Sequence, residues 1–159
     1  MQQKETSKPR DLTEISGVPD GGRIVAIDPG TKRVGIAVCD EHRVIASPLP
    51  VIQRTSWKKL LLQIKGTLAE FDAVALVVGL PYNFDGTESD MTAEARDMAR
   101  KLALSLEIPV YLQDERATTY EARGRLWKAG IEGEKQRALV DSEAATIILT
   151  DFLSRLVGK

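Results

Sequence analysis

The chain has 159 residues, 43% of them hydrophobic, and a formal net charge of −1 at pH 7. This size and apolar content suit one globular domain with its own core. A near-neutral chain creates no general positive field, which argues against a protein that coats nucleic acid but not against an enzyme with a local basic groove. Cys39 is the single cysteine, and no apolar run resembles a signal peptide or a membrane span, so we expect a soluble cytoplasmic protein.

Residues 1–22 are polar, contain Lys-Pro-Arg and end in Pro-Asp-Gly-Gly. This composition is typical of a flexible tail, so we place a single domain at residues 23–159. Three β-rich segments follow the tail, and the third contains two prolines, which favour the edge of a sheet. These predicted strands are Ile24–Asp28, Val34–Cys39 and Val44–Ile52.

The middle of the chain alternates helical and strand patterns. Ser56 is a candidate N-cap for a helix with an apolar stripe at helical spacing: Trp57, Leu61, Ile64 and Leu68. The continuous apolar run Ala73–Val78 predicts a strand that is covered on both faces. The loop "GLPYNFDGTESD" then leads to a second helix with one apolar side: Met91, Ala95, Met98, Leu102 and Leu106.

Beyond the second helix, the segment "PVYLQDE", which begins at Pro109, predicts a short strand. Thr118 and Glu121 have the spacing of a capping box. We therefore expect a third helix that starts just after "DERA" and ends near Gly130, because glycine commonly terminates helices.

Residues 131–140 are polar and contain glycine, so we predict a mobile loop there, followed by a final helix from Asp141 or Ser142 to about Leu156. The order of elements predicts an α/β fold with a five-stranded mixed sheet and helices on both faces. Three strands would form an antiparallel meander and two would be parallel. Right-handed crossovers would place the strand that begins at Ala73 beside the first strand.

Carboxylates stand at the ends of several predicted elements. Asp28 ends the first strand, Asp114 and Glu115 end the last strand, and Asp141 stands at the start of the last helix. Parallel strand ends form the usual ligand crevice of α/β sheets, and converging carboxylates there can hold divalent cations. Each acid also has a structural alternative: a turn residue, a solvated strand end or an N-cap. Neighbouring strand residues face opposite sides, so only one of Asp114 and Glu115 should face Asp28.

Four segments resemble the motifs of one known family. "DPGTKRVG", "VVGLPYNFDGTES", "DERATT" and "VDSEAA" are similar, in the same order, to those of the YqgF/RuvX family of Holliday-junction resolvase-like proteins. The resemblance runs from about Ile24 to Phe152. It implies a ribonuclease H-like fold and a nuclease that uses Mg²⁺ or Mn²⁺.

Carried over by motif, the resemblance implies that Asp28, Glu115 and Asp141 are both catalytic residues and metal ligands, which favours Glu115 over Asp114. It also implies processing of the 5′ end of pre-16S rRNA in ribosome biogenesis, with the ribosome as a further partner. The alternative substrate is branched DNA, cut as a Holliday junction.

The chain departs from neighbouring resolvases at two acidic positions. Those resolvases place an acid at the end of the fourth strand, where this chain has "VVGLP", and they pair two acids one turn apart in the last helix. The position one turn beyond Asp141 is Ala144, and Glu143 faces another side. With three site acids, a second metal ion would bind weakly or only with substrate.

Basic residues suit phosphate contacts without sequence readout. Between Arg116 and Arg137 there are six basic and three acidic residues, a local balance of +3. The alternative is that any one of these basic residues lies on a solvated helix face and contacts no phosphate. With the loop "NFDGTE" beside the crevice, the candidates for substrate contact are Lys32, Arg33, Asn83, Thr87, Arg116 and Arg123.

Two other classes of function compete with a nuclease. The D-x-G-T segment also resembles the phosphate loop of actin-like and sugar-kinase ATPases, which need a second similar domain that this chain is too short to contain. A catalytically silent nucleic-acid-binding adaptor would retain the same acids. The expected assembly of the protein is a monomer or a homodimer.

Overall fold

The computed structural model describes residues 14–83, 85–115 and 134–157, with the backbone alone for 134–142. The predicted third helix falls outside these residues. Within them, no helix is both long enough and apolar enough to cross a membrane. The elements in chain order are β1 (Ile24–Pro29), β2 (Arg33–Cys39), β3 (Ala46–Gln53), α1 (Trp57–Glu70), β4 (Ala75–Leu80), α2 (Asp90–Ser105), β5 (Val110–Asp114) and α4 (Glu134–Val157).

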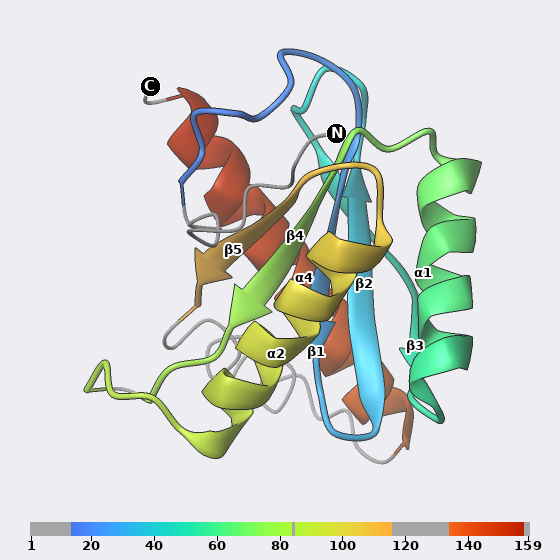
Figure 1. Cartoon of the computed structure of the whole chain (residues 1–159), viewed down its shortest axis with the longest axis vertical. Coiled ribbons are helices and arrows are strands. Elements are labelled where there is room, and N and C mark those ends of the chain that lie inside the picture. The colour runs from blue at the N-terminus through green and yellow to red at the C-terminus, as the bar shows by residue number, and fades with distance from the viewer. Residues whose placement is uncertain (1–13, 84, 116–133, 158–159) are drawn as a thin grey trace, which may run out of the picture.

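The strands form one mixed sheet in the order β3-β2-β1-β4-β5 (Figure 1). β1, β2 and β3 pair antiparallel, whereas β4 pairs parallel with both β1 and β5. This confirms the predicted meander with two parallel strands and the position of β4 beside β1. Because β1, β4 and β5 run in the same direction, their carboxyl ends lie along the same edge of the sheet, the edge that is formed by strand ends and not by an outer strand.

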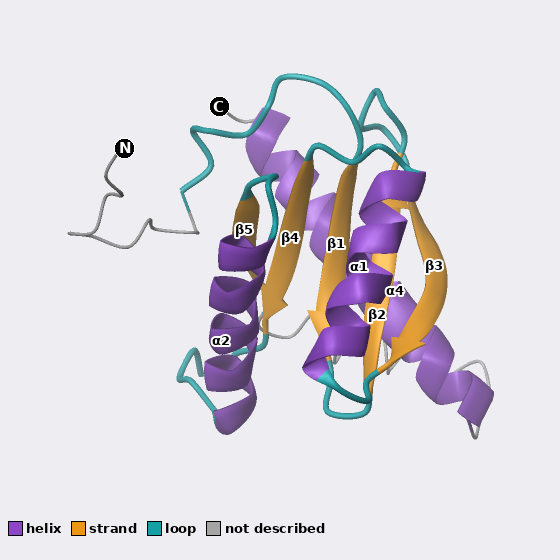
Figure 2. Ribbon diagram, turned by 45° about the vertical axis from the view of Figure 1, so that its right-hand side comes forward, coloured by secondary structure: helices purple, strands orange, loops and turns teal. Residues whose placement is uncertain are grey.

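Helices cover both faces of the sheet, with α1 and α2 on one side and α4 on the other (Figure 2). The alternation of side chains along β1 divides the core accordingly. Val25 and Ile27 pack in the cluster that includes the buried residues of α1 and α2. Ile24 and Ala26 pack in the cluster with the buried residues of α4. Burial on both faces explains why the sequences of β1 and β4 are almost wholly apolar.

Helix α1 begins after Ser56, whose side chain accepts a hydrogen bond from the backbone N–H of Lys59. The fully buried residues of the helix are Leu60, Ile64 and Leu68. The predicted apolar stripe shares Ile64 and Leu68 with this buried set. Its two other members, Trp57 and Leu61, are only partly buried.

Helix α2 starts with a capping box, in which Ser89 and Thr92 each bond the backbone of the other. Met91, predicted on the apolar side, is 44% exposed, because the adjacent Thr92 faces the sheet and one helical step is about 100°. Leu106 is the C-cap and not a member of the helix.

The turn between β2 and β3 is longer than predicted. Asp40 accepts hydrogen bonds from the backbone N–H groups of Ile45 (2.7 Å), Val44 (2.8 Å) and His42 (3.1 Å). These bonds lower the pKa of the Asp40 carboxyl. Val44 and Ile45 are 76% and 64% exposed, so β3 begins at Ala46 and the predicted start at Val44 was wrong. The Asp40 side chain thus accepts hydrogen bonds from backbone N–H groups that a longer β3 would need for strand pairing.

The last helix is also longer than predicted. α4 begins at Glu134, so the predicted loop at 131–140 is helical from 134 onward, and Asp141 lies within the helix and does not cap it. Residues 134–139 are Glu, Lys, Gln, Arg, Ala and Leu, all strong helix formers. Their propensity outweighs the polarity that suggested a loop.

Apolar packing starts before Arg23, inside the segment predicted to be a tail. Val18 is 8% exposed, and Ile15 packs against the same cluster as the buried residues of α4. These two apolar side chains interrupt the polar segment and attach part of it to the domain.

Two leucines of α1 provide a matched test of this packing. Leu60 is 1% exposed and Leu62 is 61% exposed. Leu60→Ala should lower the free energy of unfolding by about 2–5 kcal/mol, because it leaves a cavity against the sheet. Leu62→Ala should change it by less than about 0.5 kcal/mol. Urea denaturation of both variants measures the difference, and equal losses would contradict the orientation of α1.

Candidate active site

Asp28 lies near the carboxyl end of β1 and is only 8% exposed. Its neighbour across the antiparallel pair is Gly35 of β2. In β1, Ile24 and Ala26 face α4, and the alternation of side chains places Asp28 on the same face. The carboxylate of Asp28 is therefore directed toward the layer between the sheet and α4.

Glu115 follows β5 directly and is 3% exposed, whereas Asp114 is exposed. The backbone N–H of Glu115 donates to the carbonyl oxygen of Leu80, which extends the parallel pairing of β5 with β4 by one residue. Of the two neighbouring acids considered from the sequence, the structure buries Glu115.

Gly79 of β4 creates the space that the Glu115 carboxylate occupies. A Cβ atom at this glycine would collide with Oε2 of Glu115 and with Cδ1 of Ile148 in α4. The carboxylate of Glu115 therefore lies over the backbone of Gly79, between β4 and α4. The parallel pairing of β1 with β4 ends at Ile27 and Val78, so Gly79 follows in register beside Asp28, at the usual strand spacing of about 4.8 Å. The two buried carboxylates thus share one edge and one face of the sheet.

Asp141 lies in α4, one helical turn before two fully buried residues, Ala144 and Ala145. Positions 141, 144 and 145 share one face of the helix because of its 3.6-residue period. The side chain of Asp141 is outside the described part of the chain. Its backbone position is on the helix that covers the face toward which Asp28 and Glu115 are directed.

The donor set is compatible with a hard divalent cation. Asp28 and Glu115 provide carboxylate oxygens, the ligands that Mg²⁺ and Mn²⁺ prefer. Among the described residues no three His, Cys, Asp or Glu side chains are grouped to hold an ion. Asp141, the third ligand predicted from the sequence, has its side chain outside the described part of the chain.

The predicted basic contacts lie partly at this edge. Lys32 is exposed in the turn between β1 and β2, and the partly buried Arg33 is the first residue of β2, paired with Gln53. Arg116 and Arg123 fall outside the described residues. The β1–β2 turn thus carries one exposed cation, four residues after Asp28.

In the β4–α2 loop, Asn83 and Thr87 bond to each other. The Asn83 side chain donates to Oγ1 of Thr87 at 2.9 Å, and the Asn83 N–H donates to the Thr87 carbonyl at 2.9 Å. Asp85 accepts from both the hydroxyl (2.7 Å) and the N–H (3.0 Å) of Thr87, and these bonds lower the pKa of Asp85. The two residues predicted to contact substrate thus close the turn, with their side chains on its exposed surface.

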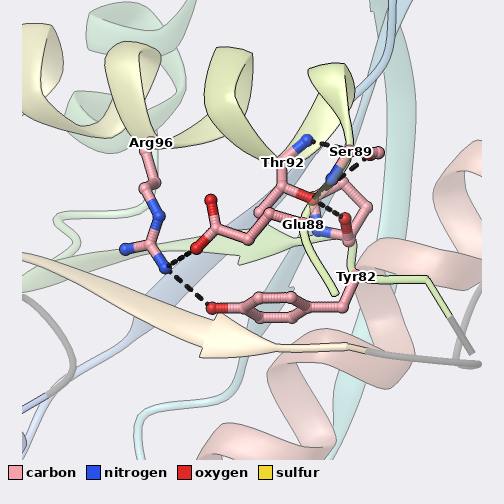
Figure 3. Close-up of polar contacts among 6 residues, drawn as sticks. Tyr82, Glu88, Ser89, Thr92 and Arg96 are labelled. Atoms are coloured by element: carbon pink, nitrogen blue, oxygen red, sulfur yellow. Dashed lines mark hydrogen bonds and ion pairs between the residues drawn. The ribbon is translucent and has the colours of Figure 1, made fainter. Parts of the chain in front are cut away.

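The start of this loop is held by side chains of α2 (Figure 3). Arg96 donates from Nη2 to the hydroxyl of Tyr82 at 2.8 Å and to Oε2 of Glu88 at 2.7 Å. The buried hydroxyl of Thr92 donates to the carbonyl of Pro81. These contacts hold the loop against the N-terminal half of α2, at the sheet edge where β4 ends.

Sequence reasoning missed Gly79 and Arg96 as parts of this region. Gly79 did carry a signal, because a glycine inside an apolar strand often marks the close approach of another group. Arg96 carried none, because an arginine on an amphipathic helix is usually solvated.

Comparison with known proteins identifies the family. The model of the family described as "RuvX: Holliday junction resolvase" matches residues 22–155. The chain belongs to the RuvX family. A relative from Thiobacillus denitrificans, named "Putative pre-16S rRNA nuclease", is 42% identical over 138 residues, covering 87% of this chain and 95% of the relative. A relative of the same name from an Anaeromyxobacter strain is 39% identical over 131 residues, covering 82% of this chain and 96% of the relative.

Solved structures similar to this RuvX-family chain include two resolvases. RuvC from T. thermophilus, in complex with a Holliday junction substrate, has a TM-score of 0.53 at 19% identity, covering 86% of this chain and 96% of RuvC. The Fowlpox virus resolvase in complex with junction DNA has a TM-score of 0.50 at 8% identity, covering 85% of this chain and 99% of the resolvase. These similarities confirm the ribonuclease H-like fold.

The glycine under the Glu115 carboxylate leads to a direct test. In Gly79→Ala, the added methyl group overlaps the Glu115 carboxylate and Ile148, and overpacking of this kind costs about 1–3 kcal/mol of unfolding free energy. Gly66→Ala is the control, because a Cβ there meets nothing within 4 Å and alanine favours the helix. Chemical denaturation should show a loss for the first variant and none for the second. A fully stable Gly79→Ala would contradict the position of Glu115.

Proposed function

We propose that this RuvX-family protein is a divalent-metal-dependent nuclease that hydrolyses phosphodiester bonds in structured nucleic acid. The observation that carries the proposal is the burial of two carboxylates at the carboxyl ends of the parallel strands, on the same face of the sheet. Glu115 lies over Gly79, and Gly79 adjoins the strand position of Asp28. Two like charges in a partly desolvated layer repel each other unless a cation compensates them. Such an arrangement is suited to holding a metal ion.

In this proposal the ion is held by Asp28, Glu115 and Asp141. When bound, Mg²⁺ or Mn²⁺ supplies an activated water and stabilises the charge that develops on the phosphate oxygens. The protein residues orient the scissile phosphate. Lys32, exposed on the β1–β2 turn, provides a cation for a phosphate oxygen, and the β4–α2 loop lies at the same end of the parallel strands.

The proposed substrate is the 5′ end of pre-16S rRNA in the cytoplasm, with the ribosome or its precursor presenting the RNA. This proposal is supported by the similarity to relatives whose names give that substrate, over more than 80% of the chain. The net charge of −1 also favours a structured or presented substrate, because it offers little general attraction for unstructured nucleic acid.

A second candidate activity is resolution of DNA four-way junctions. The description of the family and the fold shared with RuvC favour it. Against it stands the residue at the end of β4, where neighbouring resolvases carry an acid and this chain has Gly79. In this chain the carboxylate at that place comes from Glu115, one strand further along.

A cleavage assay decides between these activities. Purified protein with Mn²⁺ or Mg²⁺ should cut a precursor 16S rRNA fragment near its mature 5′ end, and Asp28→Asn should abolish cutting. Preferential cutting of a synthetic four-way junction would support the second candidate. Binding without cutting of either substrate would indicate the silent adaptor.

Metal binding can be tested without activity. Mn²⁺ at about 100 times its Kd should stabilise the protein by about 2.7 kcal/mol by mass action. For a chain of this size that corresponds to a Tm increase of roughly 5–11 °C. Glu115→Gln should remove most of the increase while leaving the stability without metal unchanged or higher, because one of two like charges is lost.

Asp114→Asn is the matched control for that experiment. Asp114 is exposed and belongs to the same strand end, so its variant should retain the full Mn²⁺-dependent increase in Tm. Loss of the increase in Asp114→Asn, with retention in Glu115→Gln, would show that the ion binds at the other carboxylate. Thermal denaturation at several Mn²⁺ concentrations measures both.

Lys32 provides the test of substrate contact. If its ammonium group contacts a phosphate, Lys32→Ala should reduce the slope of log Kd against log salt concentration by about 1, with little dependence on sequence. Lys65, exposed on α1, is the control and should leave the slope unchanged when replaced by alanine. Equal slopes in both variants and the original protein would assign Lys32 to the solvated surface.

A further inference from the structure

Arg54 connects the end of β3 to the turn that follows Asp28. It stands directly after Gln53, the last residue of β3, and its side chain is 29% exposed. Nη1 of Arg54 donates to the carbonyl oxygen of Gly30 at 2.6 Å, a partly buried hydrogen bond between residues 24 positions apart. A guanidinium bond to a carbonyl is charge-assisted and stronger than a neutral one.

The same turn is held by two backbone bonds. The N–H of Arg54 donates to the carbonyl of Lys32 at 2.9 Å, and the N–H of Gly30 donates to the carbonyl of Arg33 at 3.0 Å. A Cβ at Gly30 would come within 2.5 Å of the Arg33 carbonyl oxygen, so only glycine fits the closed turn. Arg54 thus contacts the turn through both its backbone and its side chain.

This turn joins two groups whose relative positions matter for the proposed reaction. Asp28 is two residues before Gly30, and Lys32 is two residues after it. Both groups stand within two peptide units of the carbonyl that Arg54 binds. A displacement of about 1 Å in a catalytic group can cost on the order of a hundredfold in rate. A side chain that holds the turn therefore affects the geometry of both groups.

We propose that Arg54 is a positioning residue for the nuclease reaction: its guanidinium holds the Gly30 turn so that Asp28 and Lys32 keep their relative geometry. This inference rests on the proposed function. Arg54 acts through the turn, without contact to the reacting atoms. An arginine suits the task because its planar fork is preorganised and stays charged at any working pH.

Two other roles for Arg54 lead to different outcomes. Its Nη1 lies 3.9 Å from Oε1 of Glu94 in α2, a long contact with an exposed acid that contributes little to stability. Arg54 also lines a cavity of about 390 Å³ between α1 and α2, together with Trp57 and Lys101. A phosphate contact from that cavity would change the salt dependence of binding and leave the turn as it is.

The test compares Arg54→Ala, Arg54→Lys and Glu94→Gln by amide hydrogen exchange, Mn²⁺ titration and kinetics. In Arg54→Ala the amides of residues 30 and 54 should exchange about tenfold faster or more, because the hydrogen bond that restrains the turn is lost. The amides of β4 and β5 should stay protected. The Mn²⁺ Kd should rise several-fold, on the order of fivefold, and kcat should fall by roughly 10- to 100-fold with KM changed less than about threefold.

Arg54→Lys should restore part of both the protection and kcat, because an ammonium can still donate to the Gly30 carbonyl but lacks the rigid fork. It also replaces the alanine variant if that variant does not fold. Glu94→Gln should behave as the original protein in all three measurements.

Unchanged exchange at residues 30 and 54 in Arg54→Ala would overturn the proposal. If the slope of log Kd against log salt concentration is also lower in that variant, Arg54 is a phosphate contact instead. If the original protein cuts neither substrate, the proposed function fails. Amide exchange and the Mn²⁺ Kd then still decide whether Arg54 holds the turn and the metal-binding geometry.

Discussion

The missing side chain at Gly79 is the constraint on which the candidate site depends. β4 is buried on both faces, and at this one position toward α4 the sheet offers space in place of a methyl or larger group. The carboxylate of Glu115 and the end of Ile148 occupy that space together. Any larger residue would separate α4 from the sheet or expel the carboxylate, so one glycine determines both helix packing and the position of an acid.

The site combines this packing with parallel strand order. β1, β4 and β5 are adjacent and parallel, so acids from strands far apart in sequence reach the same edge. Asp28 and Glu115 are buried there, in a layer where electrostatic interactions are stronger than in water. The proposed metal ion would add a favourable interaction with both carboxylates in this layer.

Two arginines hold the loops on either side of the acids. Arg54, at the end of β3, bonds the carbonyl of Gly30 in the β1–β2 turn. Arg96, on α2, bonds Tyr82 and Glu88 at the two sides of the β4–α2 loop. Both loops adjoin the edge where Asp28 and Glu115 lie, and both are held by side chains from other elements. Restraint by distant elements keeps exposed loops ordered beside a buried site.

The sequence by itself determined the strands, the mixed sheet and the family, because apolar periodicity and turn residues are local and the four motifs are contiguous. It misplaced the starts of β3 and α4, where the hydrogen bonds of Asp40 and the helix propensity of residues 134–139 prevailed. Alternation allowed one of Asp114 and Glu115 to face inward, and family resemblance favoured Glu115. Only the tertiary structure decided that Glu115 lies over Gly79 and that Arg54 reaches Gly30, because both contacts join residues far apart in the chain, and no local pattern encodes which distant backbone a side chain will meet.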